Sequence, residues 1–192
     1  MEDGRKRVVI EAVSPEIDGG RFPAKRVVGE SVVVEADIFA DGHDLLAARL
    51  LFRREGASDW SEATMKQGVN DRWKGVFTVE EEGLYSYTIQ AWVDRFLSWR
   101  QGLSKKVSAG QEVSVDLLMG AEILEGLIPS ATGEDAGRLK NGVKILRSSG
   151  KETIRTDAAM DEELAAAAGR CQEGKWATVY ERELRVVVEP VR

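Results

Sequence analysis

The sequence of 192 residues contains only one cysteine, Cys171, and one histidine, His43. One cysteine cannot form a disulfide within the chain, and a zinc site of Cys and His ligands needs about four such side chains. A Ser-His-Asp triad would depend on His43 alone. This scarcity excludes a disulfide framework and a Cys/His zinc site within one chain, and we expect neither a metal nor a cofactor.

The sequence also lacks a long apolar run and a block of basic residues. No stretch approaches the roughly 20 apolar residues that span a bilayer, and the charged residues 1–7 are not followed by a long apolar segment. The 27 lysines and arginines are scattered and face 33 aspartates and glutamates, which gives a formal net charge of -6. We therefore expect a cytoplasmic protein that binds neither membranes nor nucleic acid.

What the sequence does contain, in its first half, is the two-residue period of β-strands. Within residues 30–40, Val32, Val34, Ala36 and Ile38 alternate with more polar positions, which is typical of a half-buried strand. The expected strands are residues 7–13, 30–40, 48–53, 60–65, 72–79 and 84–93. Short strands separated by turns rich in Gly, Asn and Asp predict an antiparallel β-sandwich of immunoglobulin-like type.

After Gly102 the apolar residues recur at helical spacing, and the sequence predicts helices over residues 113–126, 134–146 and 157–170. The period returns to two at residues 178–188, and a lone terminal strand must pair with an existing sheet to satisfy its backbone hydrogen bonds. The sequence is therefore expected to be mostly β with an α insert. The expected domains are a β-sandwich of residues 1–103 and 177–192 and an inserted helical bundle of residues 104–176.

Local motifs give little support to catalysis. Residues 169–175 match most of a phosphate-binding loop, but Trp176 replaces the Ser or Thr that binds Mg²⁺, and the segment runs from helix to strand instead of strand to helix. Residues 41–44 and 80–82 contain acidic side chains, and we expect solvated turns at both places. We expect Cys171 to be structural.

Aromatic residues gather in the predicted strands, where core packing is the simplest interpretation. Trp92 differs because it lies on the opposite face of its strand from Tyr85 and Tyr87, and a second indole follows shortly after it among arginines. A polar loop before residue 25 also carries an aromatic beside an arginine. Clustered aromatics and arginines are typical of interfaces, so we expect exposed contact surfaces here. The candidate binding or interface residues are Arg21, Phe22, Trp92, Arg95, Trp99 and Arg100.

Several stretches of the sequence resemble the N-terminal region of the α-1,4-glucan:maltose-1-phosphate maltosyltransferases, which belong to the α-amylase superfamily. These stretches are residues 9–18, 20–30, 36–44, 91–100 and 180–190. The likeness covers almost the whole chain and is weaker across residues 127–173. It implies a β-sandwich with an inserted helical subdomain, followed after residue 192 by the catalytic barrel.

The resemblance also implies an activity for the parent protein. Enzymes of this family transfer maltosyl units from α-maltose 1-phosphate to α-1,4-glucans such as glycogen, with retention of configuration and release of phosphate. Retention requires a carboxylate nucleophile and a carboxylic general acid about 5 Å apart. Those residues belong to the barrel, so no catalytic residue is expected within this sequence.

Three roles remain open for the chain itself. In the first, it is a non-catalytic assembly domain that contacts its own catalytic barrel and a second subunit of a homodimer. In the second, it is a carbohydrate-binding module of this or another α-amylase-family enzyme, with Trp92 and Trp99 stacking on sugar rings of an α-glucan. The third, an autonomous small enzyme, is the weakest because no sequence pattern brings titratable groups together. Assembly is favoured because few amide or carboxylate side chains lie near the two indoles.

Overall fold

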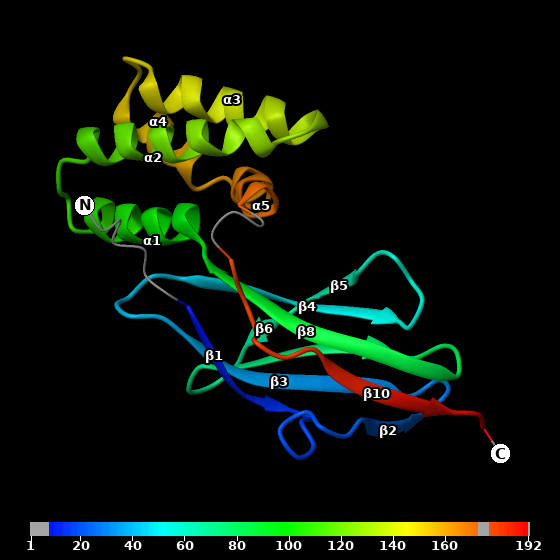
Figure 1. Ribbon diagram of the computed structural model, residues 1–192. Helices are drawn as coiled ribbons and strands as arrows, with labels where there is room; N and C mark the ends of the chain where they lie inside the picture. Colours follow the sequence, from blue (N-terminus) through cyan, green and yellow to red (C-terminus); the bar gives the residue numbers. More distant parts are fainter. Residues whose placement is uncertain (1–7, 173–176, 192) are drawn as a thin grey trace, which may run out of the picture. The chain divides into compact units, whose positions relative to one another are not determined.

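The computed structural model describes residues 8–172 and 177–191, which form two compact units (Figure 1). The sheet unit contains the described residues 8–42, 46–93 and 177–191, and the helical unit contains residues 43–45 and 94–172. The strands are β1 (Val9–Ser14), β2 (Ala24–Val27), β3 (Ser31–Phe39), β4 (Leu46–Arg54), β5 (Ser61–Thr64), β6 (Lys66–Gln67), β7 (Arg72–Thr78), β8 (Gly83–Val93), β9 (Thr178–Val179) and β10 (Leu184–Glu189). The helices are α1 (Arg95–Ser108), α2 (Ser114–Leu127), the short 3₁₀ helix η1 (Ile128–Ser130), α3 (Gly133–Arg147), α4 (Glu152–Ala159) and α5 (Glu162–Cys171).

The sheet unit consists of two sheets whose inner faces contribute to one hydrophobic core. One sheet has the order β1-β3-β7-β6, and the other has the order β2-β10-β8-β4-β5 with β9 also paired to β8. The expected strand face is confirmed in β3, because Val32, Val34, Ala36 and Ile38 are at most 1% exposed. Stacking of Phe52 on β4 and Phe77 on β7, with ring centroids 4.5 Å apart, joins the two sheets within this core.

The expectation of purely antiparallel sheets is wrong at one pair of strands. β10 pairs with β8 in antiparallel fashion on one side and with β2 in parallel fashion on the other. The parallel pair joins Ala24–Val27 to a strand about 160 residues later in the sequence. No turn connects these two strands, and their relative direction therefore leaves no signal in the local sequence.

The helical unit begins earlier than expected, because α1 starts at Arg95 directly after β8. The Asp94 side chain caps this helix by accepting a hydrogen bond from the Leu97 amide at 2.9 Å, and Phe96 and Leu103 are buried on one face. The domain boundary expected between residues 103 and 104 falls inside α1. The two compact units instead divide between Val93 and Asp94.

The expected helices at 113–126 and 134–146 correspond closely to α2 and α3. The single helix expected over residues 157–170 is instead two helices, α4 and α5, interrupted at Met160 and Asp161. Met160 is the C-cap of α4, and Asp161 begins α5 as its N-cap, because its carboxylate accepts from the Glu163 amide at 2.8 Å.

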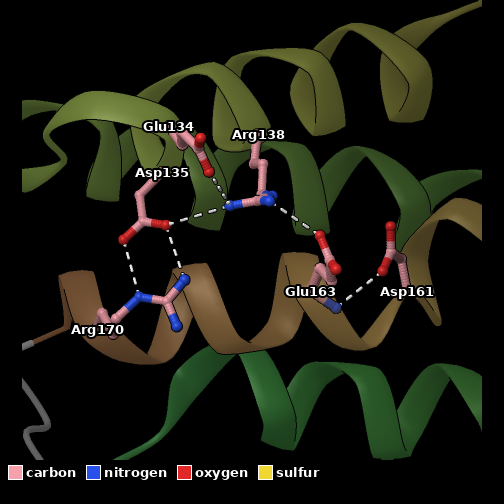
Figure 2. Close-up of polar contacts among 6 residues, drawn as sticks. All are labelled: Glu134, Asp135, Arg138, Asp161, Glu163 and Arg170. Carbon is pink, nitrogen blue, oxygen red and sulfur yellow. Dashed lines mark hydrogen bonds and ion pairs between the residues drawn. The ribbon is translucent and has the colours of Figure 1, made fainter.

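Ion pairs link α3 to α5 on the surface of the helical unit (Figure 2). The two nitrogens Nε and Nη2 of Arg170 donate to both carboxylate oxygens of Asp135 at 2.9 and 2.7 Å, and Arg138 lies 3.0 Å from Glu163. The hydrogen bond from Arg170, together with its charge, lowers the pKa of the Asp135 carboxyl. Exposed pairs contribute little stability singly, but a paired fork geometry fixes how two helices align.

Candidate functional site

Trp92 is buried, so the expectation that its side chain is exposed is wrong. Its side chain is 7% exposed although it points away from the strand face that carries Tyr85 and Tyr87. The Arg49 guanidinium covers the indole, with its central carbon 5.5 Å from the ring centroid, and Trp92 lies opposite Ala47 of the neighbouring strand. The face opposite the sandwich core is therefore also covered at this end of β8.

Trp99 is a packing residue of the helical unit rather than an exposed platform. Its indole Nε1 donates to the Asp116 carbonyl oxygen at 2.7 Å, and its ring lies 5.4 Å from that of Phe96. The six-membered ring rests against Gly120 of α2, where a Cβ atom would lie 2.1 Å from Trp99 Cζ2. Trp99 lies on helix α1 and contacts α2, and the sequence analysis predicted no helix at residues 95–108.

Arg95 and Arg100, the two arginines beside these indoles, differ in exposure and in contacts. Arg95 is exposed at the start of α1, and its backbone amide donates to Gln172 Oε1 at 2.7 Å. Arg100 has a side chain only 17% exposed, donates from Nη1 to the Met160 carbonyl at 3.3 Å and lies 3.0 Å from Glu162. A guanidinium at the last carbonyls of α4 compensates the negative end of that helix, so Arg100 serves the structure of the helical unit.

Arg21 and Phe22 lie on an exposed loop of the sheet unit, as expected. Phe22 is 52% exposed, and the Arg21 guanidinium lies 5.4 Å from its ring centroid. Phe22 pairs across the loop with Ile17, which is 44% exposed, so the loop presents two apolar side chains. Their role in binding stays a prediction.

The sheet unit also contains a polar pocket of about 330 Å³ that the sequence did not reveal. Residues 10–13 and Glu16 line one side, and residues 180–182 line the other. Glu16 holds the two sides together, because its carboxylate accepts from the Tyr180 hydroxyl at 2.6 Å and from Arg182 Nη1 at 2.5 Å. These partners lie more than 160 residues apart, and no local motif joins them, although both segments belong to stretches that carry the family resemblance.

Tyr180 and Tyr87, the two tyrosines near Glu16, have a pKa above that of a tyrosine in water. Burial, and then the hydrogen bond to Glu16 and its charge, raise the pKa of Tyr180 to about 12. Burial also raises the pKa of Tyr87, whose hydroxyl donates to the Pro15 carbonyl oxygen. Both phenols are therefore neutral hydrogen-bond donors at physiological pH.

The raised pKa of Tyr180 predicts a pH dependence. Because the folded state favours the neutral phenol, Tyr180 contributes stability below the ordinary pKa of 10.0, and this contribution is lost as the pH rises toward 12. Ultraviolet titration of the folded chain is expected to show a tyrosinate step near pH 12 that disappears in Tyr180→Phe. In Glu16→Gln the step is expected at lower pH, and an unchanged midpoint in that variant would contradict the assigned hydrogen bond.

The structure describes only part of the weak motifs of the sequence. Among residues 8–172 and 177–191, no three His, Cys, Asp or Glu side chains are placed to hold a metal ion. Cys171 is buried at the end of α5, and residues 173–176 of the segment resembling a phosphate loop lie outside the described residues. No helix in the described ranges is both long and apolar enough to cross a membrane.

Known proteins of one family match this chain along nearly its whole length. The family described as alpha-1,4-glucan:maltose-1-phosphate maltosyltransferase, domain N/S, matches residues 6–190. Similar proteins of that name occur in Chlorobaculum tepidum, 49% identical over 187 residues and 97% of this chain, and in Myxococcus xanthus, 40% identical over 190 residues and 95% of this chain. A third, in Cereibacter sphaeroides, is 40% identical over 158 residues and 77% of this chain.

The matched regions are only part of these relatives. The chain covers 28% of the length of the Chlorobaculum tepidum and Myxococcus xanthus proteins and 27% of the Cereibacter sphaeroides protein. The match to domain N/S extends over both the sheet unit and the helical unit. The chain therefore belongs to the domain N/S family of the α-1,4-glucan:maltose-1-phosphate maltosyltransferases.

Proposed function

We propose that this chain is the non-catalytic N-terminal assembly domain of a maltosyltransferase of the α-amylase family. The parent enzyme transfers maltosyl units from α-maltose 1-phosphate to an α-1,4-glucan of the glycogen type, with retention and release of phosphate. Residues 6–190 match domain N/S, and the chain covers only 28% of the length of its Chlorobaculum tepidum relative. Both findings support a non-catalytic domain that is separate from the catalytic part of the enzyme. The two carboxylates that retention needs then belong to the remainder of the enzyme.

The proposed architecture is an immunoglobulin-like sandwich with an inserted helical subdomain, in a cytoplasmic homodimer. Two sheets with a common core support the sandwich. All described helices fall in sequence between β8 and β9, two strands that pair with each other, and this order supports the insertion. The domain contacts its own catalytic barrel and a second subunit.

A stripe of exposed apolar residues on α2 is the main observation in support of an assembly role. Val115, Leu118 and Met119 are 65%, 46% and 51% exposed, and their spacing places them on one face of the helix. The opposite face of α2 is already buried through Leu117 and Leu124. Exposed apolar side chains gathered on one helix face are typical of protein interfaces, and a second subunit is the partner that we assign to this stripe.

A chimera tests the proposed function. We expect that replacing the matching region of the Chlorobaculum tepidum enzyme with this chain preserves phosphate release from α-maltose 1-phosphate in the presence of glycogen. The chain alone is expected to release phosphate only at the background rate, because the reacting carboxylates lie elsewhere. Turnover by the purified chain alone would overturn the non-catalytic assignment.

The assembly role is tested in the same chimera by sedimentation. Leu118→Glu is expected to shift dimers toward monomers because it places a charge in a desolvated contact. Ser104→Glu, at an exposed position on α1, is the matched control and is expected to leave the sedimentation unchanged. Dimers of undiminished stability in Leu118→Glu would exclude the α2 stripe as the interface.

A further inference from the structure

The loop that connects β1 to β2 presents exposed apolar side chains on the sheet unit. Ile17 and Phe22 pair across this loop and are 44% and 52% exposed. The Arg21 guanidinium lies 5.4 Å from the centroid of the Phe22 ring. Aromatic and arginine side chains are enriched at the centres of protein interfaces, so this loop has the composition of a contact surface.

Hydrogen bonds and close packing fix the loop in this conformation. Within the loop, the Gly20 amide donates to the Ile17 carbonyl oxygen at 3.1 Å. From β10, Arg185 Nη2 donates to the Arg21 carbonyl oxygen at 3.2 Å. Gly20 has a φ of +83°, and a Cβ atom there would lie 2.9 Å from Leu184 Cδ2. A partner that docks on this loop therefore meets a preformed surface, which lowers the entropic cost of the contact.

The strand that follows the loop, β2, lies at the rim of its sheet beside β10, and its other edge is closed to a further strand (Figure 1). The Val27 amide donates to Glu30 Oε2 at 2.8 Å, and the Val27 carbonyl oxygen accepts from the Glu30 amide at 3.0 Å. The Lys25 carbonyl oxygen accepts from Arg26 Nη1 at 2.7 Å, and Pro23 has no N–H to donate. A partner at this edge is therefore held by side chains and not by strand addition.

The far end of β2 lies beside the end of β10, the last strand of the sheet unit. Val27 pairs with Glu189, and the Val28 amide donates to the Glu189 carbonyl oxygen at 3.1 Å. Val191, two residues further on, is 70% exposed. The extended segment from Phe22 to Val27 spans about 16 Å. A globular body of several hundred residues has a radius of gyration of about 20 Å, so one such body can contact both the loop and the end of β10.

The exposed apolar area decides between a separate partner and a covalently connected one. Ile17 and Phe22 are each about half exposed and together offer about 200 Å² on this side, since a whole aromatic side chain buries roughly 150–250 Å². Stable association of separate proteins needs about 1,000 Å² or more from both partners. A partner on the same polypeptide has an effective concentration of about millimolar, so a smaller contact is enough to hold it.

We infer that the loop around Phe22, with the adjoining side chains of β2, is the surface on which the catalytic part of the same polypeptide packs. The choice of this partner rests on the proposed function, in which the catalytic part follows residue 192. Arg21 and Lys25, whose side chains are 76% and 79% exposed, place positive charge beside the apolar side chains. The facing surface of the catalytic part is therefore apolar with carboxylates at its rim.

Thiol accessibility in the chimera tests the inference. Lys25→Cys places a thiol on β2, and the natural Cys171 is buried. We expect this new thiol to react with a maleimide at least about tenfold more slowly in the chimera than in the 192-residue chain, because the catalytic part covers it. Val69→Cys, at an 80% exposed position between β6 and β7, is the matched control and is expected to react equally fast in both proteins. Peptide mapping by mass spectrometry assigns each label.

Phe22→Glu tests whether Phe22 anchors the contact. Added to Lys25→Cys in the chimera, it is expected to restore fast labelling, because it places a charge in a desolvated contact. In the 192-residue chain it is expected to leave the unfolding midpoint unchanged, because Phe22 is 52% exposed there.

Three results would overturn the inference. The first is equal labelling of Lys25→Cys in the chain and the chimera, and the second is protection that persists with Phe22→Glu. The third is protection that disappears when Leu118→Glu separates the dimer, because a second copy would then be the covering surface. Phosphate release by the chimera reports separately on the proposed function.

Discussion

Trp99→Ala is expected to lower the free energy of unfolding of the helical unit by about 3 kcal/mol or more, the range found when large aromatic side chains are removed from cores. The substitution removes the contact of the indole with Phe96 and Gly120 and the 2.7 Å hydrogen bond to the Asp116 carbonyl. It leaves a space between α1 and α2 that the helix backbones cannot close without moving. Chemical denaturation followed by helical circular dichroism measures the loss, and hydrogen exchange of the α1 and α2 amides locates it.

A double-mutant cycle with Gly120 separates this contact from a general loss of stability. Gly120→Ala alone is expected to cost about 1–3 kcal/mol, because the new methyl would lie 2.1 Å from Trp99 Cζ2. In the Trp99→Ala background the same methyl enters vacated space, so its cost is expected to disappear. Val107→Ala is the control, because Val107 is 41% exposed on α1, the helix that carries Trp99. It is expected to change the free energy of unfolding by less than about 0.5 kcal/mol. Additive effects of Trp99→Ala and Gly120→Ala would contradict the described packing.

Trp99 also illustrates which structural features the sequence could predict. Alternation of apolar residues correctly predicted the buried face of β3 and the positions of α2 and α3, because these patterns depend on local periodicity. The sequence predicts exposure of these two indoles because Trp92 breaks the inward alternation of its strand and Trp99 lies just beyond that strand among arginines. That interpretation assumed that only one face of β8 is covered, and the burial of Trp92 contradicts it; Trp99 lies instead on helix α1.

Other features depend on residues far apart in the sequence and leave no local signal. The parallel pairing of β2 with β10 and the contacts of Glu16 with Tyr180 and Arg182 each join the beginning of the sequence to its end. Neither periodicity nor turn residues encode which distant segments meet. The start of α1 is different, because Asp94 is a good N-cap residue and its position was available from the sequence.

Asp94 connects the start of α1 to the residue that follows α5. Its Oδ1 accepts from the Leu97 amide at 2.9 Å and from Gln172 Nε2 at 2.7 Å, and Gln172 Oε1 in turn accepts from the Arg95 amide at 2.7 Å. Both side chains are buried, with Asp94 3% and Gln172 9% exposed. Two amides of the first turn of α1 are thus satisfied by two side chains that also bind each other.

Asp94→Ala is expected to destabilise the helical unit by about 2–4 kcal/mol, because loss of an N-cap costs about 1 kcal/mol and a buried amide left without its acceptor costs about 1–3 kcal/mol. Asp94→Asn keeps an oxygen acceptor and is expected to recover most of this loss. The control is Asp161→Ala, which removes the N-cap of α5 at an exposed position and is expected to cost only about 1 kcal/mol. Denaturant unfolding of the three variants measures the difference. Equal losses of unfolding free energy in Asp94→Ala and Asp161→Ala would mean that the buried hydrogen bond between Asp94 and Gln172 adds nothing to the cap. A larger loss in Asp94→Ala, with faster hydrogen exchange at the Arg95 and Leu97 amides, would establish that contribution.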